Sequence, residues 1–538
     1  MEYDLIIKNG FIVDGTGNPG FKADLAVIDD EIKKIASKID AKAKSVIDAQ
    51  GKTVVPGFID PHVHEELVVL ESGLFEDFLK QGVTTIVNGN CGHSVTPGAS
   101  KNVFEYMYKN GLVSTEAKEY YTEHKWSSLS EYIELVKQKG FNLNMGVLLG
   151  HGTIRWSVMG GSKDREPTTE ETQEIAAIIE EGLKEGALGM STGLSYIPSR
   201  YAKTEELVKA AKVLAKYDSI YTSHIRYYEG EVEAVKEAIE IGKKADVRVQ
   251  VSHLTPTVSE AYDEILKARD EGVEIAVDTI PKSSGHCTRK DRMLQFIMAL
   301  SSDLFEEGIE GVKRALKDEK GREKILKEAV IFGDDRSNIY VINTNDDKLE
   351  GKSIEEIAKE KDENPDDLLL DMLADDDLDF TLWLGGMNRD DFPGTEYSDS
   401  VSENPLVMVG SDRIFGETDD PGAWYELFRR GAFPIFYKLM TDKGVRLEEI
   451  IRRLTSLPAQ QFRLTNRGLL KEGLKADLAV IDFDNYSYPN EDTIDYSKPI
   501  TLARGVDNVV VNGKVVLNNG EVKNVGAGKF LSRNGKEL

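Results

Sequence analysis

The 538-residue chain has only two cysteines, no long apolar run and fewer basic than acidic residues. Cys91 and Cys287 are too few for a disulfide framework, which fits a reducing compartment. No uninterrupted apolar stretch reaches transmembrane length, and the sequence begins without an apolar signal segment. We therefore expect a cytoplasmic protein that does not act in a membrane.

The excess of acidic residues narrows the range of partners. The chain has 94 acidic and 67 basic residues, and its formal net charge is −27. Such a charge disfavours binding to nucleic acid or to an anionic membrane surface, and it favours solubility. Apolar residues make up 40 % of the chain, which is enough for a large core.

The two ends of the chain resemble each other. The eight residues Lys22–Asp29 return unchanged as Lys475–Asp482, and short apolar runs separated by turn residues flank both copies. Asn9-Gly10 predicts a hairpin turn within the first of these runs. We predict that residues 1–55 and 465–538 meet in one small β-sandwich domain.

The middle of the chain alternates between short apolar runs and helical patterns, which is the rhythm of a parallel βα sheet or barrel. Residues 56–464 are therefore predicted to form a βα barrel, with an irregular, acidic insertion at about residues 290–400. The helices expected between strands include 204–216 and 231–244. The predicted fold class is α/β, a (β/α)8 barrel beside the terminal β-sandwich.

Polar residues follow most of the predicted barrel strands. Five of the eight histidines lie at such strand ends: His62, His64, His151, His224 and His253. In a (β/α)8 barrel the carboxyl ends of the strands meet on one face, where active sites are built. The histidines are therefore expected to lie close together.

The strand-end residues include a set that suits a metal ion. Histidine, thiolate and carboxylate are zinc ligands, and the set is large enough for one or two ions. His62 and His64 are one residue apart in an extended segment, so their side chains point to the same side. The predicted ligands are His62, His64, Cys91, His224, His253 and Asp412.

Sequence motifs along almost the whole chain carry a family resemblance. They include residues 56–60 before the two histidines, Gly89-Asn90-Cys91-Gly92, residues 150–155, residues 186–194, His224-Ile225-Arg226, Val251-Ser252-His253 and Gly410-Ser411-Asp412. The pattern resembles the amidohydrolase superfamily, and within it the D-aminoacylase (N-acyl-D-amino-acid deacylase) branch. The cysteine is the branch-defining feature, because other amidohydrolases use a carbamylated lysine to bridge two metals.

The resemblance implies a βα barrel beside a β-sandwich and a zinc-dependent hydrolysis of a linear amide. It implies a tightly held Zn²⁺ on Cys91, His224 and His253, and a second, weaker position on His62, His64 and Asp412. The expected substrate is a small acylated amino acid, most directly an N-acyl-D-amino acid. Metal-activated water would attack the amide while Asp412 acts as general base and then general acid.

Substrate recognition departs from the family pattern. Where relatives carry an arginine for the substrate carboxylate, this chain reads Asp420-Pro421-Gly422, and Arg413 stands where a glycine normally follows the Ser-Asp pair. A carboxylate prefers a bidentate guanidinium, so another cation is needed. The predicted substrate-binding residues are Tyr196, Arg226, Lys282, Arg413 and His151, with Arg200 as a further candidate cation.

Two alternatives remain open at this stage. A cyclic-amide hydrolase of the hydantoinase or dihydroorotase type shares the barrel, although a bridging lysine would be expected there. A non-catalytic amidohydrolase-like scaffold is the other alternative, but such proteins usually lose metal ligands.

Overall fold

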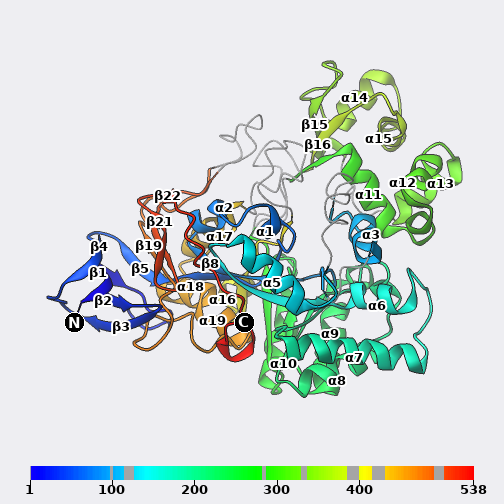
Figure 1. The fold of residues 1–538 in the computed structure, drawn as a ribbon. Helices are drawn as coiled ribbons and strands as arrows, with labels where there is room; N and C mark the ends of the chain where they lie inside the picture. Colours follow the sequence, from blue (N-terminus) through cyan, green and yellow to red (C-terminus); the bar gives the residue numbers. More distant parts are fainter. Residues whose placement is uncertain are drawn as a thin grey trace.

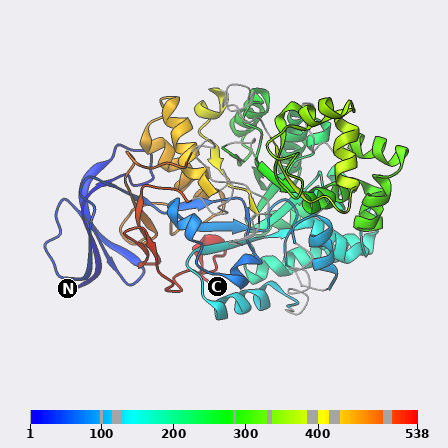
Figure 2. The same cartoon turned by 90° about the horizontal axis from the view of Figure 1, so that it is seen from above.

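The structure is a computed structural model that describes residues 2–96, 101–113, 126–281, 286–328, 336–384, 399–414, 430–489 and 502–538. It has three parts. A β-domain of both chain ends lies on the left in Figure 1, a βα barrel lies beside it, and an insertion projects at the upper right. Figure 2, seen from above, again places the first and last strands side by side.

Eight parallel strands of the described residues form one sheet, in the order β17-β13-β12-β11-β10-β9-β8-β6. All their residues are buried, because helices cover the outer face of the sheet. The parallel pair of β7 (Val63–His64) and β18 (Arg413–Ile414) links the two end strands. The predicted (β/α)8 barrel is therefore confirmed. Its strands are β6 (Phe58–Asp60), β8 (Val83–Asn88), β9 (Asn144–Gly150), β10 (Gly189–Gly193), β11 (Ile220–His224), β12 (Arg248–Val251), β13 (Ile275–Thr279) and β17 (Val407–Val409).

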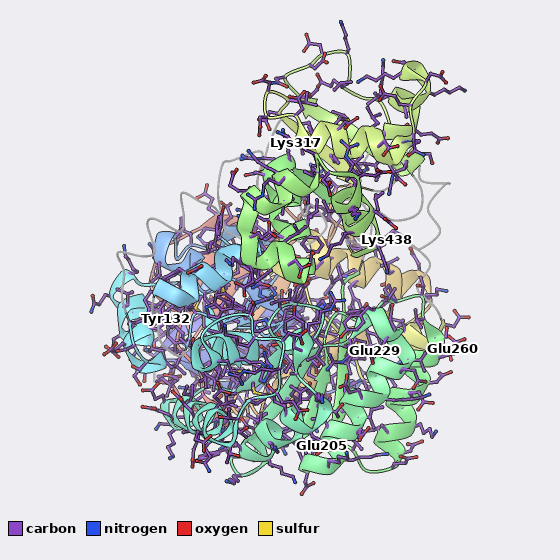
Figure 3. All side chains as sticks on the ribbon, turned by 90° about the vertical axis from the view of Figure 1, so that its right-hand side faces the viewer. Tyr132, Glu205, Glu229, Glu260, Lys317 and Lys438 are labelled. Carbon is purple, nitrogen blue, oxygen red and sulfur yellow. The ribbon has the colours of Figure 1, made fainter. Side chains whose placement is uncertain are left out.

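Amphipathic helices surround the barrel. The Thr168 side chain and Glu171 form a capping box at the start of α7, which satisfies backbone N–H groups that the first turn leaves free. Exposed acidic side chains such as Glu205 and Glu260 point away from the barrel helices in Figure 3. The helices of the barrel include α1 (Val68–Glu71), α2 (Glu76–Lys80), α3 (Lys101–Lys109), α5 (Leu129–Lys139), α6 (His151–Met159), α7 (Thr169–Glu185), α8 (Thr204–Ala215), α9 (Glu231–Ala245), α10 (Ser259–Asp270), α16 (Asp399–Glu403), α17 (Ala432–Asp442), α18 (Leu447–Leu454) and α19 (Ser456–Gln461).

Strands from both ends of the chain form a second sheet, as predicted. In the described residues it has nine strands in the order β22-β21-β20-β19-β5-β1-β2-β3, with β4 paired to β1. The antiparallel pair of β5 and β19 joins the N-terminal and C-terminal halves. The strands are β1 (Tyr3–Ile12), β2 (Phe21–Ile28), β3 (Glu31–Ala36), β4 (Ala43–Asp48), β5 (Thr53–Pro56), β19 (Leu478–Ile481), β20 (Val506–Val511), β21 (Lys514–Asn518) and β22 (Glu521–Val522).

The hairpin turn predicted at Asn9-Gly10 is wrong. β1 continues through both residues, and the register with β2 shifts between Ile7 and Gly10. Asn9 has a φ of 60°, and its backbone N–H donates to Asp24 Oδ1 at 2.9 Å. Asn9, with its left-handed backbone, therefore forms a bulge within β1. Its N–H is bonded to Asp24 on the neighbouring strand β2 and not across a hairpin turn.

The insertion has a core of its own. Apolar residues of its helices and strands form a hydrophobic cluster separate from that of the barrel. Lys109 Nζ of α3 donates to the Phe305 carbonyl at 2.8 Å, which attaches the insertion to the barrel. Its elements are β14 (His286–Arg289), α11 (Lys290–Leu300), α12 (Ser302–Ala315), α13 (Glu319–Glu328), β15 (Ile339–Thr344), α14 (Ile354–Lys361), α15 (Pro365–Ala374) and β16 (Phe380–Leu384). Throughout the described segments, every helix is too short or too polar to span a membrane.

Candidate metal centre

The six predicted metal ligands lie at the carboxyl ends of barrel strands. They follow or end β6, β7, β8, β11, β12 and β17. Three of them, Cys91, His253 and Asp412, have φ values of 53°, 39° and 48°. Left-handed backbone is costly for residues other than glycine and concentrates at functional sites. Three of the six predicted ligands thus have a backbone conformation that is common at functional sites.

The side chains form two groups that share the thiol of Cys91. His62, His64, Cys91 and Asp412 make up one group and Cys91, His224 and His253 the other, and the ligand atoms within each group lie within 4.8 Å of one another. Cys91 Sγ is 3.3 Å from His62 Nε2 and 3.4 Å from His253 Nε2. The thiol therefore faces both groups at once.

The carboxylate of Asp412 faces the first group. Its Oδ1 lies 3.2 Å from His62 Nε2 and 3.2 Å from His64 Nε2. In the second group, His224 Nδ1 is 2.8 Å from His253 Nε2. Nitrogen, sulfur and carboxylate oxygen at these separations are the donor set that zinc prefers.

The protonation states of His224 and His253 also suit a cation. Burial lowers the pKa of His253 to about 4, and burial followed by the proximity of His253 lowers the pKa of His224 well below its usual value. Both imidazoles are therefore neutral at pH 7, as ligation requires. Burial raises the pKa of the Cys91 thiol to about 11. A bound cation would reverse that shift, because it stabilises the thiolate. The donor set therefore fits a metal ion.

Further side chains hold the ligands in place. Asp278 Oδ1 accepts the backbone N–H of His253 at 2.8 Å and lies 3.3 Å from His62 Nδ1. The hydroxyl of Tyr227 is 3.0 Å from His253 Nδ1. Asp60 Oδ1 accepts the backbone N–H groups of His62 and Ser411. Such outer contacts orient metal ligands.

A family model for amidohydrolases matches residues 45–284 and 393–517. The chain belongs to the amidohydrolase family. The D-aminoacylase of Alcaligenes xylosoxydans xylosoxydans is 28 % identical to it over 99 % of this chain and 98 % of its own length. The prediction of an amidohydrolase of the D-aminoacylase branch is thereby confirmed.

Two solved structures of relatives contain metal centres. A D-aminoacylase with a binuclear metal center has a TM-score of 0.74 and 26 % identity, and the match covers 99 % of this chain and 100 % of that one. The N-acyl-D-glutamate deacylase of Bordetella bronchiseptica, complexed with zinc and a phosphonate inhibitor, has the same score, identity and coverage. Metal use by relatives of this amidohydrolase agrees with the ligand groups described above.

The predicted substrate-binding residues lie in different surroundings. The ring of Tyr196 is 4.6 Å from the ring of His224, centroid to centroid, so Tyr196 borders the metal centre. Arg226 is buried and pairs with Glu237, its Nε 2.9 Å from Oε2. Arg413 is buried and pairs with Asp77. A role of these residues in substrate binding stays a prediction.

Three candidates remain: His151, Lys282 and Arg200, whose guanidinium lies 4.6 Å from the ring centroid of Tyr228. His151 begins α6 and is buried, with Nδ1 3.0 Å from Ser199 Oγ and Nε2 3.3 Å from Glu206 Oε1. Lys282 lies outside the described residues, as does the stretch Asp420–Gly422. Their roles also stay predictions.

Three residues near the metal centre of this amidohydrolase were missed by the sequence analysis: Asp278, Tyr227 and His93. Asp278 ends β13, so the strand-end rule that selected the histidines also applied to it. His93 follows Cys91 by two residues, and its ring lies 5.0 Å from that of Tyr196. Tyr227 lies in a short helical turn and carried no signal in the sequence.

Proposed function

We propose that the protein is a zinc-dependent hydrolase of linear amides that deacylates N-acyl-D-amino acids. The observation that carries this proposal is the shared thiol of Cys91, which faces two ligand groups while Asp412 faces His62 and His64. The relatives named above, a D-aminoacylase and an N-acyl-D-glutamate deacylase, support the substrate class.

Zinc held by these residues would lower the pKa of a water molecule and polarise the amide carbonyl. We assign the proton transfers to the carboxylate of Asp412. It accepts a proton from the attacking water and then donates it to the nitrogen of the departing amine. The backbone N–H of Asp412 donates to the His62 carbonyl at 2.8 Å, which holds the carboxylate beside both histidines.

The other residues of the site bind and orient. Cys91, His224 and His253 would hold the tightly bound ion, and His62, His64 and Asp412 the weaker one. Cys91 is a ligand in this proposal and not a nucleophile, because water attacks the carbonyl and no acyl-enzyme is needed. Tyr196 borders His224 and would face the substrate.

Release of free amine from a panel of N-acyl-D-amino acids, N-acyl-L-amino acids, dipeptides and cyclic amides tests the proposal. We expect turnover of the N-acyl-D-amino acids, and a loss of about 10²- to 10⁴-fold in kcat for Asp412→Asn with zinc still bound at Cys91. Activity on cyclic amides alone would contradict the proposal in favour of a hydantoinase-like enzyme. A purified protein without metal and without turnover would favour a scaffold.

A further inference from the structure

Arg413, the residue that follows Asp412, has a buried guanidinium. Its Nη1 pairs with Asp77 Oδ2 on α2, and its Nε lies 3.6 Å from Glu65 Oε1. The guanidinium also lies 5.0 Å from the ring centroid of Phe78. Arg413 therefore joins the segment after Asp412 to Glu65 and to α2, both of which are distant from it in the sequence.

The two carboxylates around Arg413 need a cation. Glu65 and Asp77 are both almost fully buried, and Arg430 Nη1 is 3.8 Å from Asp77 Oδ2. A buried carboxylate without a paired charge is strongly destabilising. Since the guanidinium of Arg413 compensates these charges, it is oriented toward α2 and Glu65.

The contacts of Arg413 are connected to the metal ligands through the backbone. Arg413 directly follows Asp412, and in the β18–β7 register it pairs with Val63, which lies between His62 and His64. Glu65 follows His64, and its backbone N–H donates to Asn88 Oδ1 at 2.8 Å. A shift of Arg413 would therefore displace two metal ligands together: Asp412, which precedes it in the chain, and His64, which precedes its partner Glu65.

We propose that Arg413 is a positioning residue, which holds Asp412 and His64 at the spacing a cation requires, and is not the cation that binds the substrate carboxylate. The inference rests on the proposed metal-dependent function. It assigns a role to a residue that stands where a glycine is usual. Loss of Arg413 should affect the His62, His64 and Asp412 position far more than the Cys91, His224 and His253 position.

Binding of Zn²⁺ alone, followed by calorimetry and metal analysis on the full chain, tests the proposal. In Arg413→Met the dissociation constant of the second equivalent should rise about 10- to 100-fold, the effect typical of residues that orient metal ligands. The dissociation constant of the first equivalent should differ from the wild-type value by less than about threefold. Equal weakening of both equivalents, no weakening, or a wild-type protein that binds only one ion would overturn the proposal.

Arg467 supplies a matched control in the β-domain. It is equally buried, pairs with Asp477 and lies 3.7 Å from Glu537 through Nη2 and Oε1. Arg467→Met should lower the thermal midpoint but leave both zinc equivalents unchanged. If Arg413→Met does not fold, Asp77→Asn retains the arginine but removes the paired charge that orients its guanidinium, and the same selective weakening of the second equivalent is expected.

Kinetics separate positioning from carboxylate binding. We expect Arg413→Met to lower kcat by the same factor for an N-acyl-D-amino acid and for its neutral amide, with KM unchanged. A rise in KM for the acid alone would show that Arg413 holds the carboxylate and would overturn the proposal. If the wild-type protein hydrolyses neither substrate, the proposed function fails, while the zinc measurements still decide the role of Arg413.

Discussion

Tyr227 contacts His253 on the side of the ring that faces away from Cys91. Its hydroxyl is 3.0 Å from Nδ1, whereas Nε2 faces Cys91 Sγ at 3.4 Å. The nitrogen opposite the ligand atom sets the tautomer and the orientation of a ligating histidine. Tyr227 is thus expected to tune the tightly bound ion without touching it.

Tyr227→Phe removes this hydroxyl and keeps the ring. We expect the affinity for the first zinc equivalent to fall at least about tenfold, as for other partners of metal-bound histidines. Competition with a chelator of known affinity measures it. Tyr217→Phe is the control, because its hydroxyl donates to Glu180 on the outer helices at 2.7 Å. Equal zinc affinities of the wild type and Tyr227→Phe would show that the contact between Tyr227 and His253 does not contribute to zinc binding.

At the residue scale, positions at strand ends indicated side chains that lie close together. His62, His64, Cys91 and Asp412 lie within reach of one cation, and their role as ligands stays a prediction. The surroundings of the cationic candidates could not be predicted. Arg413 pairs with Asp77, 336 positions away in the sequence, and no local pattern indicates which distant carboxylate compensates a buried guanidinium.

The loop between β10 and α8, residues 194–203, is an element held from two sides. Arg226 Nη2 donates to the Ala202 carbonyl at 2.8 Å, and Arg155 Nη1 donates to the Pro198 carbonyl at 3.3 Å. Each arginine pairs with a glutamate, Arg226 with Glu237 and Arg155 with Glu206. Because Tyr196 lies in this loop, the two ion pairs hold a residue of the proposed site.

Glu206→Gln should lower the free energy of unfolding by about 3–5 kcal/mol at pH 7, because it leaves the buried Arg155 without its paired charge. Burial opposes ionisation of Glu206, but contacts with His151 and Arg155 outweigh it and lower the pKa of this carboxyl below 4.5. Because the pKa of Glu206 is lower in the folded protein than in the unfolded chain, its ionised carboxylate stabilises the fold at pH values above the unfolded pKa. This contribution is lost as the pH falls through the folded pKa.

The stability difference between wild type and Glu206→Gln should therefore be full at pH 7 and shrink below about pH 4.5, the usual pKa of a glutamate. Urea unfolding at several pH values measures it. The control is Glu205→Gln: Glu205 is exposed, pairs with Lys244 at the surface, and should leave the unfolding free energy almost unchanged. A stability difference between wild type and Glu206→Gln that does not change with pH would show that the ionised carboxylate of Glu206 is not its cause.

Element types could be predicted better than local backbone irregularities. The helices expected at 204–216 and 231–244 correspond to α8 and α9 within a residue at each end, because their apolar period is long and regular. Asn9-Gly10 led to the wrong prediction of a hairpin turn, because residues that favour left-handed backbone occur both in turns and in bulges. The hydrogen bond to Asp24 on a neighbouring strand decides between them.

Across the whole molecule, a buried polar network joins the β-domain to the barrel. Asn144 begins β9, and its Nδ2 donates to Asp477 Oδ2 at 3.0 Å. Its Oδ1 accepts from Asn512 Nδ2 at 2.7 Å. The network lies at the amino end of β9, away from the carboxyl ends that carry the metal ligands.

Asn144→Ala should lower the free energy of unfolding by about 1–3 kcal/mol, because Asp477 and Asn512 lose buried hydrogen-bond partners. Zinc content should not change. Thermal and urea unfolding with metal analysis test both statements. Asn18→Ala is the control, since Asn18 is exposed and its side chain donates to Thr16 Oγ1 within the same turn. Loss of zinc in Asn144→Ala would contradict the separation of the network from the site.

The pairing of β5 with β19 has a consequence for the order of folding during synthesis. β5 ends at Pro56, and its partner β19 begins at Leu478, about 420 residues later. At the usual speed of a ribosome the wait is roughly 20–80 s. During that time the edge of β5 stays open while the barrel emerges, so the β-domain is completed last although its first strands are made first.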